Sequence, residues 1–145
     1  MQTTLFPSDA IPFEEDVVRV LNYGGGVNST ALLIECVERR IHLDLIVFAD
    51  TGSERPETYE YLKVMNDWLV SKGYPEITMT RWVRVRKPWT GQFLPLHEWC
   101  RHFKSLPSKA FGLSGCTGKW KQQPIDKLLK QHPLVVPEHE AGRQV

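Results

Sequence analysis

A glycine-rich turn between two apolar runs constrains the fold of this chain more than any other feature. The first run, residues 17–21, is rich in valine, which is typical of a strand buried on both faces of a parallel sheet. Gly24–Gly26 follow, and they allow a tight turn that a ligand can approach closely. Asn28–Thr30 then offer capping side chains to the second run, and we predict a helix over residues 29–40.

A strand, a glycine turn and a helix N-terminus in this order form a binding site suited to an anion. The first backbone N–H groups of a helix have no partner within the helix, and the helix dipole adds partial positive charge at the same place. We therefore expect a phosphate group to bind at residues 24–29.

Further apolar runs complete an alternation of strands and helices. Strands are predicted at residues 43–49 and 76–85, helices at 55–71, 94–103 and 125–131, and a loop at 104–121. This β-α-β-α-β order predicts an α/β fold, with a parallel sheet and flanking helices in a Rossmann-like arrangement. Ligands of such sheets bind beyond the carboxyl ends of the strands, so we expect residues 24–26, 50–53 and 84–87 to meet at one edge.

The length and composition of the chain favour a single globular domain. The chain has 145 residues, 41% of them hydrophobic, and no apolar run approaches the ~20 residues of a membrane span. We expect residues 17–132 to form the domain, after an extended lead-in at 1–16 and before a tail at 133–145. The three cysteines predict neither a disulfide framework nor a metal site, and we expect a cytoplasmic protein.

Charge is divided unevenly along the chain. Residues 1–80 hold 6 Lys or Arg and 13 Asp or Glu, whereas residues 81–130 hold 11 and 2. This division is either an uneven solvated surface or the positive wall of a site for a polyanion. On the second interpretation, the countercharge comes from Arg84, Arg86, Lys87, Lys119 and Lys121.

The glycine turn admits two nucleotide-binding motifs. One is the dinucleotide fingerprint GxGxxG, with Asp50 as the ribose-binding acid about twenty residues further on. Against it, Ser29 stands at the position of the third glycine or alanine, and the chain leaves no room for a catalytic domain. A Walker loop is excluded because no Gly-Lys-Ser/Thr sequence follows the turn.

The other motif rests on a resemblance that three segments carry. Residues 24–29 resemble the PP-loop, SGGxDS, of the adenine nucleotide alpha-hydrolase superfamily, which includes N-type ATP pyrophosphatases and phosphoadenosine phosphosulfate (PAPS) reductases. Residues 48–62 are similar to its second motif, a strand ending in DTG before a helix that opens PETYE. Residues 116–125 resemble the CTxxxKxxP segment of the PAPS reductase branch. The resemblance implies an adenine nucleotide alpha-hydrolase-like fold.

The resemblance also implies a site for an adenine nucleotide, which is ATP or a sulfonucleotide such as PAPS or APS. Together with the strand ends, it gives the expected nucleotide-binding residues: Gly24, Gly25, Gly26, Asn28, Ser29, Asp50, Thr51, Gly52, Arg84 and Lys87. Lys119, Lys121 and Asp50 are the expected catalytic residues, since the lysines would close over the anion. Asp50 would lie near the adenosine or a Mg²⁺ ion. No iron–sulfur cluster is expected, because Gly115 precedes Cys116 where iron–sulfur members have a cysteine pair.

Departures from the family pattern narrow the expected chemistry. Gly24 replaces a serine and Asn28 an aspartate, so the turn has no carboxylate to hold a metal ion. The cysteine of the ECGxH motif of PAPS reductases is absent, since residues 138–140 are Glu-His-Glu. We expect a PP-loop ATP pyrophosphatase or PAPS reductase-like enzyme, acting by nucleotidyl transfer with pyrophosphate release or by reductase-like chemistry. The alternative is a non-catalytic nucleotide- or nucleic-acid-binding module.

The expected partners follow from the same features. An adenine nucleotide is the first of them. A nucleic acid or a protein would contact the basic half, residues 81–130, and no membrane contact is expected.

Overall fold

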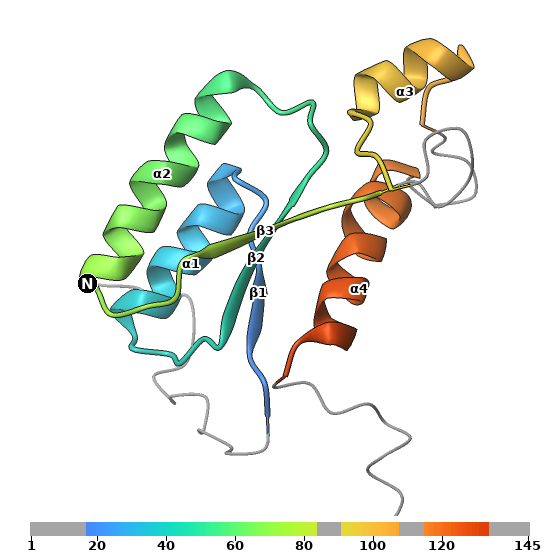
Figure 1. The fold of residues 1–145 in the computed structure, drawn as a ribbon. Helices are drawn as coiled ribbons and strands as arrows, with labels where there is room; N and C mark the ends of the chain where they lie inside the picture. Colours follow the sequence, from blue (N-terminus) through green and yellow to red (C-terminus); the bar gives the residue numbers. More distant parts are fainter. Residues whose placement is uncertain (1–16, 84–90, 108–114, 134–145) are drawn as a thin grey trace, which may run out of the picture.

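Three parallel strands form the centre of the molecule (Figure 1). The computed structural model describes residues 17–83, 91–107 and 115–133. The strands are β1 (Val20–Asn22), β2 (Leu45–Asp50) and β3 (Ile77–Arg81), and they pair in the order β1-β2-β3. Helices alternate with them along the chain. The predicted α/β class, a parallel sheet in a Rossmann-like arrangement, is therefore confirmed.

Helices cover both faces of the sheet (Figure 1). On one face lie α1 (Val27–Glu38) and α2 (Pro56–Ser71), and on the other lies α4 (Gln123–Gln131). A π-helix, η2 (Cys116–Gln122), leads directly into α4. The short helix α3 (Leu96–Phe103) lies beyond the carboxyl ends of the strands.

The central strand β2 supplies both hydrophobic cores. Its six residues are all buried, and successive side chains point to opposite faces. Ile46 and Phe48 belong to the core under α1 and α2, whereas Val47 and Ala49 pack with Ile125 of α4. Burying one such aliphatic side chain contributes roughly 1.5–3 kcal/mol.

Burial on both faces was expected for residues 17–21, and that prediction is wrong: β1 begins only at Val20, Leu21 is its one buried residue, and Val17 is 45% exposed. The strand buried on both faces is β2, because helices cover it from both sides.

The core under α1 and α2 also takes up the apolar face of α2. Leu62, Met65 and Leu69 are buried in it, and Tyr59 and Trp68 pack against it. Cys36 is buried there too, and burial raises the pKa of its thiol, as expected of a structural cysteine.

One element was predicted wrongly. The loop expected at residues 104–121 contains η2, which begins at Cys116. Gly118 and two lysines give this segment the composition of a loop, but Trp120 is only 2% exposed. Burying a tryptophan outweighs the weak local preference of such residues against helix.

Some predictions fall outside the described residues. These are the lead-in at 1–16, the basic residues Arg84, Arg86 and Lys87, and the tail from residue 134 onward. Within the described ranges, no helix is both long enough and apolar enough to cross a membrane.

Candidate functional site

A cavity of about 190 Å³ lies at the carboxyl ends of β1 and β2. It is lined by Asn22, Tyr23, Gly24, Val47, Phe48, Ala49, Thr117, Lys121, Gln122 and Ile125. Gly24 opens the glycine turn, while Thr117 and Lys121 come from η2, almost a hundred residues later. The cavity therefore lies where ligands of parallel α/β sheets bind.

The walls of this cavity are chemically mixed. Val47, Ala49 and Ile125 form an apolar part that is continuous with the core under α4. Thr117 contributes a hydroxyl group and Lys121 an ammonium group. Sites for drug-sized ligands usually measure ~300–1,000 Å³, so this one is sized for a single ring system. A larger ligand would extend from it toward the adjoining glycine turn.

The glycines of the turn differ in their surroundings. Gly25 has φ +71°, and a Cβ built there would lie 2.9 Å from Cγ2 of Thr58, so the fold itself requires a glycine. Gly26 has φ −94°, and a Cβ there would meet nothing within 4 Å. The space above Gly26 is therefore open to a ligand.

The N-terminus of α1 leaves its first turn without a side-chain cap. The helix begins at Val27, with Gly26 as N-cap, which is two residues earlier than predicted. The expected capping by Asn28, Ser29 and Thr30 is therefore wrong, because these residues lie inside the first turn. Ser29 Oγ instead donates a hydrogen bond of 3.1 Å to the Gly26 carbonyl. With no cap, the first N–H groups can serve an anion.

Asp50 is buried and fully engaged at the end of β2. It is 1% exposed. Its Oδ1 accepts hydrogen bonds from Gly52 N at 2.8 Å and Tyr59 Oη at 2.7 Å, and its Oδ2 accepts one from Arg81 Nε at 2.8 Å. Burial and the hydrogen bond to this carboxylate raise the pKa of Tyr59 to about 12. Asp50 thus ties together β2, β3 and α2.

A Mg²⁺ ion has little access to this carboxylate. Three of its roughly four lone-pair sites already have donors, and the side chain is 1% exposed, so a metal would have only the remaining site on Oδ2. Moreover, no cluster of three or more His, Cys, Asp or Glu in the described parts of the chain could hold a metal ion. The metal and catalytic roles expected for Asp50 stay predictions, and its contacts favour a positioning role.

Thr51 and Gly52 build the loop after β2. Thr51 is 3% exposed, and its hydroxyl donates to Glu54 Oε1 at 3.1 Å. Gly52 has φ +68°, and a Cβ there would lie 2.7 Å from the ring of Phe93. Arg81 lies over that ring at 4.7 Å. Neither Thr51 nor Gly52 lines the cavity, so their expected contact with a nucleotide stays a prediction.

The same loop docks helix α3 by contacts that no sequence pattern indicated. Leu96 N donates to the Thr51 carbonyl at 2.9 Å, and His97 N donates to Ser53 Oγ at 3.0 Å. Ser53 Oγ also lies 2.8 Å from His97 Nδ1. These hydrogen bonds give the first backbone N–H groups of α3 acceptors that lie outside the helix. They join residues more than forty positions apart, beyond any local window.

Lys119 and Lys121 have separate environments. Lys121 lines the cavity, but Lys119 does not. The Nζ of Lys119 lies 4.5 Å from the ring centroids of both Trp82 and Trp99, and Trp82 packs on Trp120 with centroids 4.8 Å apart. The two lysines therefore have different contacts, and the closure of both over one anion stays a prediction. Lys119 makes cation–π contacts that link η2 to α3 and to the end of β3.

The fold and the cavity define an α/β protein whose glycine turn and η2 enclose a small site at the carboxyl edge of a parallel sheet. Comparisons of the chain with protein-family models, curated proteins and solved structures found no match.

Proposed function

We propose that this chain is a PP-loop protein resembling PAPS reductase, and that it binds an adenine nucleotide at the cavity. One observation carries the proposal. The three segments on which the resemblance rests are far apart in sequence, yet each contributes to the same 190 Å³ cavity: Gly24 from the first, Phe48 and Ala49 from the second, and Thr117 and Lys121 from the third.

The adenine ring fits the cavity best, because its apolar walls and its size suit one flat ring system. The phosphates would then extend over the open space at Gly26 and meet the uncapped N–H groups of α1. Lys121 supplies positive charge, a point charge suited to phosphate or sulfate. Asp50 positions the loop after β2 through its hydrogen bonds.

The reaction class is chemistry at the phosphate or sulfate end of ATP or a sulfonucleotide. In nucleotidyl transfer, an acceptor attacks the α-phosphorus, the bond to the bridging oxygen breaks, and pyrophosphate leaves with the electron pair. The chain's part is to hold the phosphates in place and to neutralise their charge. No step is assigned to a metal ion. The cytoplasm remains the predicted location.

Calorimetry with ATP, PAPS and APS tests binding. Wild-type protein should bind at least one of them, and Lys121→Met should weaken binding by about 1.5–3 kcal/mol, as for a charged hydrogen bond. Lys72→Met, an exposed lysine just beyond α2, is the matched control and should change nothing. Equal affinity in the wild type and Lys121→Met would contradict the proposal that the nucleotide binds at this cavity.

Two activity assays separate the catalytic interpretations from a non-catalytic module. Release of pyrophosphate from ATP identifies nucleotidyl transfer. Release of sulfite from PAPS with thioredoxin identifies a reductase, and we expect none, because residues 138–140 lack the cysteine nucleophile. Nucleotide binding with neither product would favour the non-catalytic module.

A further inference from the structure

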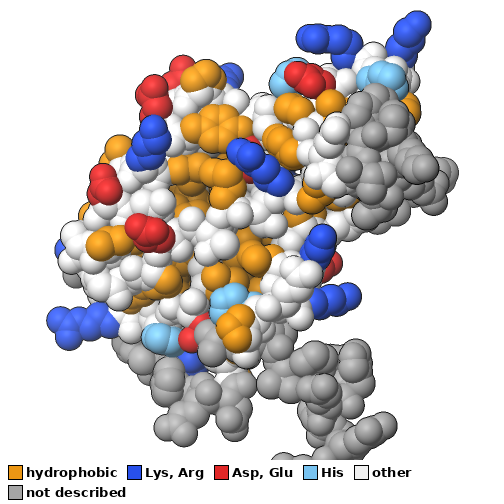
Figure 2. Space-filling model, in the orientation of Figure 1, with side chains coloured by type: hydrophobic (Ala, Val, Ile, Leu, Met, Phe, Trp, Pro, Cys, Tyr) orange, Lys and Arg blue, Asp and Glu red, His pale blue; other side chains and the backbone are white. Residues whose placement is uncertain are grey.

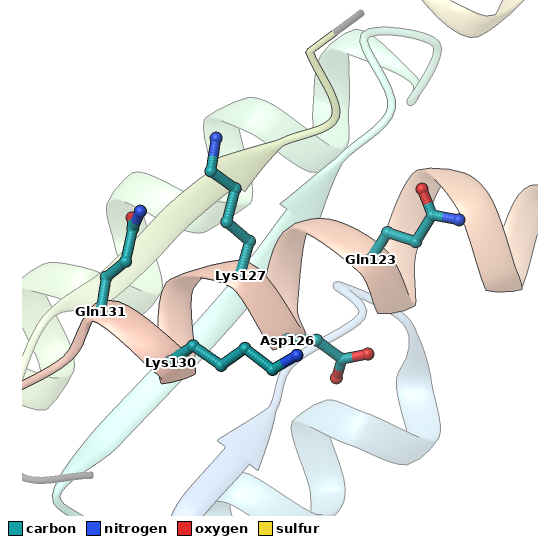
Figure 3. A pocket seen from close by; sticks show the side chains of 5 residues that line it. All are labelled: Gln123, Asp126, Lys127, Lys130 and Gln131. Carbon is teal, nitrogen blue, oxygen red and sulfur yellow. The ribbon is translucent and has the colours of Figure 1, made fainter. Parts of the chain in front are cut away.

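A second hollow lies on the outer face of α4, away from the proposed nucleotide site. Figure 3 shows its lining, Gln123, Asp126, Lys127, Lys130 and Gln131, and its volume is about 420 Å³. It shares no residue with the first cavity. All its residues come from one short helix, so it is a shallow surface site suited to an extended ligand.

The lysines of this surface lack internal counter-ions. Among the described residues, the side chains of Lys127 and Lys130 make no hydrogen bond or ion pair, and both are exposed. Asp126, the one acid in the hollow, accepts a hydrogen bond of 2.7 Å from Gln122 Nε2. Arg81, by contrast, is paired with Asp50.

The surroundings carry the same sign of charge. The side chains of Arg101 and Lys104, at the end of α3, also make no hydrogen bond or ion pair within the described ranges. Residues 81–130 hold 11 Lys or Arg against 2 Asp or Glu. On the face seen in Figure 2, acidic side chains gather over α2, whereas Lys and Arg prevail over α3 and α4. An extended anion complements this half of the molecule.

The π-helix η2 and α4 form one continuous helical rod, residues 116–131, and aromatic rings lie near its η2 end. Trp82 and Trp99 are half-buried around Lys119, and Trp99 packs on Phe103 with centroids 4.9 Å apart. From Lys119 to Lys130 the rod runs roughly 15 Å at 1.5 Å per residue. Lysines and aromatic rings along one path are the combination that binds single strands, because a duplex hides its base faces.

We propose that the outer face of η2 and α4 binds a single-stranded nucleic acid. Lys127 and Lys130 hold its phosphates, and Gln123 and Gln131 donate hydrogen bonds to it. Its bases contact the exposed parts of Trp82 and Trp99, whose ring faces already carry Lys119. This surface is separate from the cavity, so the inference does not depend on the proposed nucleotide site.

Fluorescence anisotropy with labelled single-stranded RNA and DNA, at several salt concentrations, tests the proposal. Lys127→Ala with Lys130→Ala should weaken binding and lower the log–log salt slope by about 0.7 for each phosphate that the protein no longer neutralises. Asp126→Asn, which removes a negative charge at nearly constant volume, should strengthen binding several-fold. The control pair is Lys63→Ala with Lys72→Ala, two exposed lysines of the α2 region, and it should leave both affinity and slope unchanged.

The remaining outcomes overturn the proposal. It fails if neither RNA nor DNA binds, if the Lys127/Lys130 variant keeps the wild-type slope, or if Asp126→Asn weakens binding. Preference for a duplex of the same sequence would also overturn it, since contact between the tryptophans and the bases requires unpaired bases. Calorimetry with ATP on the Lys127/Lys130 variant should match the wild type, so failure at this surface is distinguishable from failure at the cavity.

Discussion

Gly25 and Gly26 are adjacent and chemically identical, but the folded protein requires a glycine at only one of the two positions. Gly25 has a left-handed backbone, and a Cβ added there would clash with Thr58, so the fold itself requires this glycine. Gly26 has an ordinary φ, and a Cβ added there would meet nothing within 4 Å, so the free protein does not require a glycine there. A phosphate bound at the first N–H groups of α1 would require a glycine at position 26, because these groups lie beside Gly26.

Gly26→Val should therefore abolish nucleotide binding while it changes the free energy of unfolding by less than about 1 kcal/mol. The added side chain occupies open space in the free protein and the phosphate position in the complex. Gly25→Ala should cost about 1–2 kcal/mol, from backbone strain and the clash with Thr58. Urea unfolding and calorimetry measure the two effects. Unchanged ATP affinity in Gly26→Val would show that the phosphates do not bind at the glycine turn.

The hydrogen bond between Tyr59 and Asp50 should make the free energy of unfolding depend on pH in the alkaline range. Its pKa is raised from 10.0 to about 12, by burial and by its hydrogen bond to Asp50. A raised pKa means stability that is fully present below pH 10 and is lost between pH 10 and about 12. Tyr59→Phe should cost about 1.5–3 kcal/mol at neutral pH, since the variant cannot make the hydrogen bond to a charged carboxylate.

The check is urea unfolding of wild type and variant across that alkaline range. Tyr59→Phe should lose less stability than the wild type as pH rises, because one raised tyrosine is gone. Tyr61→Phe is the control, since Tyr61 lies two residues away on α2 and is 40% exposed. Parallel pH curves for Tyr59→Phe and the wild type would show that the Asp50 contact is not the cause.

Most helices and strands could be predicted because their signals are local. β2 is a continuous apolar run, and α2 has a proline at its start and apolar residues at helical spacing. The helix η2 could not be predicted, because Trp120 and Lys119 are held by Trp82 and Trp99, which lie far away in sequence. The local sequence, with its glycine and two lysines, gives no sign of these contacts.

The candidate site was predictable to a similar degree. The rule for parallel sheets gave its position, and Gly24 and Lys121 line the cavity. The sequence did not reveal that Asp50 has its oxygens occupied, or that Lys119 faces an aromatic cluster. Both depend on partners in other elements, and a charged side chain gives no local sign of whether it serves a ligand or the fold.

The environments of the two η2 lysines predict opposite phenotypes. Lys119→Met should lower stability by about 1–2 kcal/mol, from two cation–π contacts, and leave ATP affinity within about twofold. Lys121→Met should leave stability nearly unchanged and weaken ATP binding. Thermal unfolding and calorimetry on both variants give the four values. If Lys119→Met weakens ATP binding and leaves stability intact, both lysines contact the bound anion.

The proposed site exists only because the two layers of the fold meet. The glycine turn belongs to β1 and α1, whereas Thr117 and Lys121 belong to the η2–α4 rod, which packs on the opposite face of the sheet. A ligand that touches both layers must hold them together. Its binding energy then adds to the stability of each, by RT ln(1 + [L]/Kd), or about 2.7 kcal/mol at a hundredfold excess over Kd.

Hydrogen exchange should detect this coupling directly. On addition of saturating ATP, amides of residues 24–30 should exchange more slowly, because the phosphates contact them. Amides of residues 116–125 should slow as well, because the base lies between β2 and η2. The C-terminal turn of α2, residues 65–71, contacts neither and reports only the change in global stability. Protection of the turn without protection of η2 would show that the nucleotide binds outside the cavity.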